Sequence, residues 1–235
     1  MRSTEADVEA FRAKVQERGL AVTIEAGARF VLDATQKHFP TLLSADFARR
    51  QWFYAWTIDL AAALGSPLVS IWSGAIEPDT PPGDAAYSVL STRLIPTLEH
   101  AASKGVTLCF EPEPGMLVQT IDDYQRLCGH LSKRTELSLA LTIDTGHLAA
   151  GEAPPWDTRV LAAAPVLKNV QLDDAKTGVH EHLLFGDGDV DFRAIARALT
   201  SSNYDGPCSV ELSRHSHDAV NVAKKAIRFL RDVGF

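Results

Sequence analysis

Residues 139–148 read Leu-Ala-Leu-Thr-Ile-Asp-Thr-Gly-His-Leu, an apolar run that ends in an acid and an imidazole. A short run of this kind is typical of a strand buried on both faces, as in a parallel sheet covered by helices. Asp144, Gly146 and His147 then lie at the carboxyl end of the strand, where the loops of parallel α/β folds build their sites. A second interpretation stays open, in which Asp144 only caps the next turn and His147 is a satisfied surface histidine.

Helical and strand patterns alternate along the rest of the chain. Apolar stripes, capping residues and terminal glycines predict helices over 3–18, 46–64, 85–104, 122–131, 192–200 and 219–233. Short apolar runs predict further strands over 20–25, 68–72, 106–110, 167–172 and 208–212. Ser3 or Thr4 is expected to cap the first helix, and Pro96 to kink or split the third. Strict alternation of this kind predicts a parallel sheet with helices outside it.

The composition is that of one domain over residues 1–235. A chain of 235 residues with 46% hydrophobic residues can bury roughly 70% of its surface around one core. The net charge of −7 and the lack of a Lys/Arg cluster argue against nucleic-acid and anionic-membrane partners. Three widely spaced cysteines suggest neither a disulfide framework nor a cysteine zinc site. With no apolar leader and no run of roughly 18 apolar residues, we expect a soluble, cytoplasmic protein.

Acidic and amide side chains recur where the predicted strands end. These residues are Glu25, Glu111, Asp144, Gln171 with Asp173, and Glu211. In a barrel of parallel strands their side chains would converge at one mouth, where carboxylates repel one another unless a cation lies among them. Oxygen ligands with one imidazole suit Mg²⁺, Mn²⁺ or Co²⁺ better than a metal that prefers thiolates. The alternative is that each acid separately caps a helix or forms a salt bridge in a loop.

Five short motifs together resemble the xylose isomerase-like TIM barrels, which include sugar-phosphate isomerases and epimerases, ketose 3-epimerases and inosose dehydratases. The motifs are Phe110-Glu111-Pro112, Asp144-Thr145-Gly146-His147, Val170-Gln171-Leu172-Asp173-Asp174, the turn from Gly186 to Phe192, and Val210-Glu211-Leu212. The resemblance implies a TIM-type (β/α) barrel of parallel strands with outer helices. It also implies that the first strand-helix-strand unit is missing, either because the sequence starts late or because a partner subunit, as in a homo-oligomer, covers the open edge.

The resemblance also implies a set of site residues. Its four metal ligands would be Glu111, Asp144, Gln171 and Glu211. Glu111 and Glu211 would in addition exchange a proton with the carbon next to a substrate carbonyl, and His147 would lie beside the metal and the substrate oxygens. The third ligand position is usually His. Gln171 offers an oxygen there instead, which favours Mg²⁺ or Mn²⁺ over later transition metals.

Basic residues are the predicted substrate contacts. We assign this role to His147, His180, His182, Lys37, His38 and Arg214. His180 or His182 could instead replace Gln171 as a metal ligand. The loop over 26–43, which carries Lys37 and His38, is either a lid or a plain surface excursion. Arg214 either holds an anionic group of the substrate or is solvated.

These residues predict a metal-dependent isomerase or epimerase of a small sugar, polyol or sugar phosphate that works through an enediolate. One alternative is a metal-dependent hydrolase or lyase on the same barrel, including the endonuclease branch, against which the acidic charge counts. Another is a non-catalytic barrel that depends on a partner. Metal content separates the last alternative from the enzymes, and proton exchange into the substrate separates the isomerase from the hydrolase or lyase.

Overall fold

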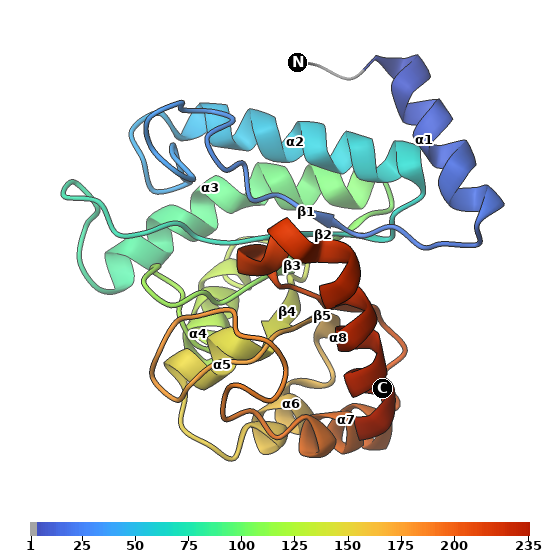
Figure 1. Cartoon of the computed structure of the whole chain (residues 1–235). Coiled ribbons are helices and arrows are strands. Elements are labelled where there is room, and N and C mark those ends of the chain that lie inside the picture. Colours follow the sequence, from blue (N-terminus) through green and yellow to red (C-terminus); the bar gives the residue numbers. More distant parts are fainter. Residues whose placement is uncertain (1–3) are drawn as a thin grey trace. The chain divides into compact units, whose positions relative to one another are not determined.

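The computed structural model describes residues 4–235, which form two compact units. The first unit runs over Met1–Phe110 with Gln125–Ala140, and the second over Glu111–Tyr124 with Leu141–Phe235. Each unit contains three parallel strands that pair in chain order (Figure 1). Within the described residues, no helix combines the length and apolar character needed to cross a lipid bilayer.

The first unit alternates helices and short strands. Its elements are α1 (Glu5–Glu17), β1 (Ile24–Glu25), α2 (Phe47–Leu64), β2 (Leu68–Ile71), α3 (Asp84–Ser103), β3 (Thr107–Phe110) and most of α4 (Ile121–Leu131). Helices α2 and α3 run side by side (Figure 1). Thr4 caps α1 as expected, because its hydroxyl accepts the Asp7 N–H while the Asp7 carboxylate accepts the Thr4 N–H. The alternative cap, Ser3, lies outside the described residues.

Two elements of the first unit differ from the sequence-based expectation. The strand predicted over 20–25 is reduced to Ile24–Glu25, because the Leu20 N–H bonds back to the Val15 carbonyl and extends the end of α1. Helix α3 is a single helix that contains Pro96. Proline removes one hydrogen bond from a helix interior at a cost of about 3 kcal/mol. The buried leucines of α3, which are Leu90, Leu94 and Leu98, offset this cost by packing against the core.

The loop over 26–43 is fastened to α2 by Arg50. The Arg50 side chain is fully buried and donates to the carbonyls of Pro40 and His38, each at 2.7 Å. Its guanidinium also lies 4.7 Å from the ring centre of Trp72. The His38 ring nitrogen Nδ1 donates to the Gly27 carbonyl at 2.5 Å. These contacts hold the loop in place. They favour the interpretation as a surface loop and argue against a freely moving lid.

The second unit carries the predicted strand ends. Its elements are β4 (Ala140–Asp144), α5 (Thr145–Gly151), α6 (Trp156–Ala163), β5 (Leu167–Leu172), α7 (Phe192–Ser201), β6 (Cys208–Val210), the 3₁₀ helix η1 (Ser213–Asp218) and α8 (Ala219–Val233). Asp191 caps α7 by accepting the Ala194 N–H at 3.0 Å, as its position predicts. Strands β4 and β5 are almost wholly buried, as expected for a parallel sheet covered by helices.

Candidate active site

Asp144 ends β4 and begins α5. Its Oδ1 atom accepts the backbone N–H of His147 at 2.7 Å, which caps the helix. Its other oxygen, Oδ2, is buried and accepts no hydrogen bond. The capping role of Asp144 is therefore confirmed, whereas His147 is buried and is not the surface histidine that the capping interpretation expects. The role of Asp144 in a site stays a prediction.

The parallel register brings the end of β5 beside Asp144. Asp144 and Gln171 are paired positions on β4 and β5, and both side chains are buried. Two residues further along, the fully buried Asp173 accepts the Gly146 N–H at 2.7 Å through Oδ1. Its Oδ2 atom lies 2.6 Å from Nδ1 of His182. The two strand ends thus place two carboxyls and an amide in one dry region.

Glu111 and His147 complete the buried part of the cluster. Nδ1 of His147 lies 3.2 Å from Oε1 of Glu111, and both side chains are less than one tenth exposed. Ligand atoms of Glu111, Asp144 and His147 all lie within 4.8 Å of one another. The same limit holds within two further trios, Asp144 with Asp173 and His182, and His147 with His180 and His182.

Charges in this region are strongly coupled. Burial raises the pKa of Asp144 to about 7, against the attraction of His147 and together with the repulsion of Asp173. Burial also raises the pKa of Asp173 to about 7, although the neighbouring Asp144 carboxyl, His147 and the Gly146 N–H oppose the change. Burial alone would lower the pKa of His147, but Asp144, Glu111 and Glu113 outweigh it and raise that pKa well above its ordinary value.

Asp174 fastens the loop that carries His180 and His182. Its carboxylate accepts the backbone N–H groups of Gly186 at 2.8 Å, Gly188 at 2.9 Å and Val190 at 3.1 Å. A Cβ on Gly188 would lie 2.0 Å from Oδ1 of Asp174, so only glycine fits at this position. The two histidines therefore lie on a loop whose far end is fixed to the end of β5.

A family model described as a xylose isomerase-like TIM barrel matches residues 1–233. The chain belongs to this family. The match confirms the resemblance drawn from the five motifs and the predicted class of parallel strands with outer helices.

Two sugar epimerases of known structure are similar to this family member. The 3-keto-D-glucoside 4-epimerase from E. coli aligns with a TM-score of 0.78 at 19% identity, over 97% of this chain and 85% of that chain. An L-ribulose 3-epimerase aligns with a TM-score of 0.74 at 22% identity, over 97% of this chain and 80% of the other. At these identities the likeness shows the fold.

One curated relative is similar in sequence. The inosose dehydratase of Clostridium botulinum (strain Alaska E43 / Type E3) is 28% identical over 143 residues, which are 53% of this chain and 46% of the relative. The chain thus spans about half the length of the curated relative that it matches.

The buried cluster of this TIM barrel chain fits a divalent cation. Carboxylates in a dry region repel one another, and a cation among them removes this penalty. The Oδ2 atom of Asp144 is buried without a hydrogen bond, as expected for an atom that binds a metal. Carboxylate and amide oxygens with one imidazole at the edge suit Mg²⁺, Mn²⁺ or Co²⁺. Glu111 and Asp144 each offer an oxygen within 4.8 Å of the other, and Gln171 is paired with Asp144 across the two strands. Their role as metal ligands stays a prediction.

Two further predicted site residues are Glu211 and Arg214. Glu211 follows β6, its N–H donates to the Leu172 carbonyl at 2.9 Å, and its charge contributes to the raised pKa of Asp173. Among the described residues, none of the three trios of closely spaced ligand atoms contains Glu211. Arg214 is exposed and lies 3.8 Å from Glu181. The roles of these residues stay predictions.

Lys37 and His38 belong to the first unit, whereas the cluster belongs to the second. His38 is half-buried and held by the Gly27 carbonyl. Burial lowers the pKa of His38, so a neutral imidazole is favoured there. Their assignment as substrate contacts also stays a prediction.

Asp173 and Asp174 are the residues whose roles sequence reasoning missed. Asp173 is one of the acids at the strand ends, but the sequence does not predict what it contacts. Its contacts with Gly146 and His182 depend on the paths of two separate loops. The signal for Asp174 was the Gly186-x-Gly188 turn. A turn with two glycines needs an acceptor for its N–H groups, and the acid is 12 residues away from the first of them.

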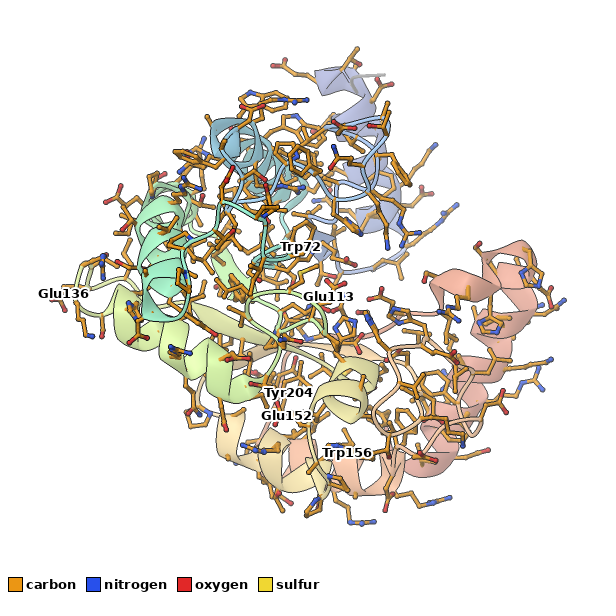
Figure 2. The ribbon with its side chains drawn as sticks, turned by 90° about the vertical axis from the view of Figure 1, so that its left-hand side faces the viewer. Trp72, Glu113, Glu136, Glu152, Trp156 and Tyr204 are labelled. Atoms are coloured by element: carbon orange, nitrogen blue, oxygen red, sulfur yellow. The ribbon has the colours of Figure 1, made fainter. Side chains whose placement is uncertain are left out.

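Glu152 is a buried acid that lies outside the cluster and holds the C-terminal end of α5. It accepts the Ile121 N–H at 2.8 Å, pairs with Arg159 at 3.1 Å, and its carbonyl accepts the Trp156 indole N–H at 2.9 Å (Figure 2). Burial raises the pKa of Glu152, while the Ile121 N–H and Arg159 oppose that change. Its contacts hold the end of α5 and thereby the helix that carries His147.

Gly146 is expected to be intolerant of a side chain. A Cβ at this position would lie 2.4 Å from Oδ2 of Asp173, so Gly146→Ala should displace that buried carboxylate and lower the free energy of unfolding by about 1–3 kcal/mol. The matched control is Gly129→Ala in α4, where a Cβ meets no atom within 4 Å. There alanine should stabilise the protein by about 0.4–1 kcal/mol. Urea unfolding of both variants checks the pair, and equal effects would contradict this account of Asp173.

Proposed function

We propose that this protein is a metal-dependent epimerase or isomerase of a small sugar, acting on the carbon next to a carbonyl. The observation that carries the proposal is the buried trio of Glu111, Asp144 and His147, with one oxygen of Asp144 left without a hydrogen bond. The two neighbours of similar fold are sugar epimerases, which supports the reaction class. This chain presents the acid Asp144 and the amide Gln171 side by side at the ends of two parallel strands.

In this proposal Asp144, Gln171, Glu111 and Glu211 hold the divalent ion. When bound, such an ion polarises a carbonyl and stabilises the negative charge that develops on its oxygen. Asp144 is suited to holding it because its backbone contact fixes the side chain, and Gln171 because its neighbouring register position adds an uncharged oxygen.

Glu111 and Glu211 carry the proton. Inversion at a carbon requires a proton to leave one face and another to arrive at the opposite face, so two separate groups are needed. Glu111 is buried and its Oε1 lies 3.2 Å from the ring of His147, which orients it and balances its charge. A dry site strengthens each of these electrostatic contacts. His147 in turn is placed to contact the substrate oxygens.

A dehydratase is the second candidate, because the curated relative is an inosose dehydratase. Both reactions begin when a carboxylate removes the proton next to a carbonyl. They differ in the following step, since an epimerase returns a proton to the same carbon and a dehydratase expels a hydroxyl from the neighbouring one. The buried acids serve either outcome.

A substrate panel tests the proposal. Protein freed of metal with a chelator is supplied with Mn²⁺, Mg²⁺ or Co²⁺ and incubated with free ketoses, ketose phosphates and inososes, and the products are separated by chromatography. We expect a ketose to yield its epimer only when an ion is present. Loss of water from an inosose without epimerisation would favour the dehydratase. No conversion of any member with any ion would contradict both enzymes.

The choice between a free sugar and a sugar phosphate depends on the basic residues. Arg214 is the nearest predicted anion contact in sequence to Glu211, and it lies 3.8 Å from Glu181, which already balances part of its charge. We therefore propose an uncharged sugar as the preferred substrate. The cysteines Cys109, Cys128 and Cys208 form no disulfide, in agreement with the cytoplasmic location that we propose.

A further inference from the structure

Helix α1 (Glu5–Glu17) has an apolar stripe that its own unit does not fully cover. Val8, Phe11 and Val15 follow one another along one side of the helix. None of the residues of α1 is buried, and Phe11 is about half exposed. An isolated helix of 13 residues is marginal in water, so such a helix depends on packing for its stability. The stripe therefore offers apolar surface to a partner.

The neighbouring helix exposes further aromatic side chains. Helix α2 packs beside α1 within the first unit (Figure 1). Trp52 and Trp56 lie one turn apart on α2, and each is about half exposed. Aromatic residues are enriched in protein interfaces, and exposed apolar side chains that cluster often mark one. The first unit thus presents aromatic side chains on two adjacent helices.

The charges beside the stripe are complementary to those of a second copy of α1. Helical spacing places Glu5 and Arg12 on one side of the stripe. It places Asp7 and Lys14 on the other side. On each side the acid lies in the amino-terminal half of the helix and the base in the carboxyl-terminal half. A copy of α1 that runs antiparallel across a two-fold axis therefore brings every one of these acids opposite a base.

These charges also select the direction of the partner helix. The antiparallel pair brings Glu5 opposite Arg12 and Asp7 opposite Lys14, each twice by symmetry. A parallel pair brings only Asp7 opposite Arg12. Within residues 4–235, the buried Nε atom of Arg12 donates no hydrogen bond, so a carboxylate from a partner would supply a missing acceptor. Exposed ion pairs add little affinity, but they determine which arrangement is allowed.

We propose that this protein is a homodimer in which α1 of one protomer packs antiparallel against α1 of its partner. In this arrangement Val8 of each protomer meets Phe11 of the other. A helix of this length spans about 20 Å, which is too little for the roughly 800 Å² that a stable interface buries on each partner. Trp52 and Trp56 therefore border the contact. The inference does not depend on the proposed enzyme activity, because α1 belongs to the first unit and the carboxylate cluster to the second.

An exchange of charges tests the antiparallel arrangement. Sedimentation equilibrium of the full-length protein gives the dimer Kd of the wild type, of Glu5→Arg, of Arg12→Glu and of the double variant. We expect the Kd to rise by about 10–100-fold in each single variant, where like charges face each other, and to return close to the wild-type value in the double variant. The matched control Glu17→Arg makes the same change on the opposite side of α1 and should leave the Kd unchanged. A double variant that dimerises no better than the single variants would overturn the proposal.

Two further measurements do not depend on these charge variants. Phe11→Glu changes a half-exposed side chain, so the fold should persist while the protein sediments as a monomer. Hydrogen exchange of the wild type should show protection of the α1 amides that rises with protein concentration across the range in which the dimer forms. A wild type that stays monomeric, a Phe11→Glu protein that dimerises like the wild type, or α1 protection that does not change as the dimer forms would each overturn the proposal.

Discussion

Glu111→Gln is expected to lower kcat for epimerisation by about 10²–10⁴-fold, which is the usual contribution of a positioned acid or base. Glutamine has nearly the same shape but cannot take up a proton at neutral pH. Glu111 is buried beside His147, so the amide fits the same space and the fold should persist. Glu211→Gln should lower kcat to a similar extent. The measurement is the initial rate of epimer formation at saturating sugar and metal.

The matched control is Glu136→Gln, which makes the same change at an exposed residue of the first unit (Figure 2). It should leave kcat unchanged. Thermal unfolding of all three variants separates a loss of chemistry from a loss of structure. A Glu111→Gln or Glu211→Gln protein that keeps wild-type kcat would remove that residue from the reaction.

Protein kept free of metal is expected to lose stability as the pH rises from about 4 to about 7. The pKa values of Asp144 and Asp173 are raised from 3.8 to about 7 by burial, so the folded state binds more protons than the unfolded state across this range. Groups with a raised pKa favour the folded state below their unfolded value, and this advantage disappears above their folded value. The raised pKa of His147 acts in the same direction.

Each unit of pKa difference corresponds to about 1.4 kcal/mol, so the two acids make this a change of several kcal/mol. A divalent ion should reverse it, because the ion binds the ionised carboxylates of the folded state. Calorimetry at about pH 5 and about pH 8, with chelator or with Mn²⁺, measures both effects. Asp144→Asn should flatten the profile. A transition temperature that rises with pH in the presence of chelator would contradict the assignment.

Much of the second unit follows from local sequence patterns. The apolar run over 139–148 ends at a buried strand whose last residue both caps α5 and faces the cluster, as its Asp-x-x-His spacing allows. The pairing of Asp144 with Gln171 follows from two buried runs of parallel strand, because both end at the same edge. These features depend on periodicity and caps, which are properties of short segments.

The features that could not be predicted depend on contacts between distant loops. Asp174 organises residues 12 to 16 positions away, and Arg50 fastens the loop over 26–43 through backbone carbonyls, which have no sequence signature. Helical spacing in the aromatic segment of α2 predicts that its apolar face packs in the core. Phe53 and Tyr54 do so, whereas Trp52 and Trp56 are about half exposed, because helical spacing defines a face but not its width.

Proton exchange with heavy water shows whether the protein moves a proton at the carbon next to the carbonyl. Wild-type protein loaded with Mn²⁺ is incubated in heavy water with the sugar that it converts, and NMR follows the hydrogen on the carbon next to the carbonyl. We expect deuterium to enter this position in both epimers, and a chelator to abolish the exchange. Epimer formed with its original hydrogen at that carbon, or exchange that continues without any divalent ion, would contradict a metal-dependent proton transfer by these carboxylates.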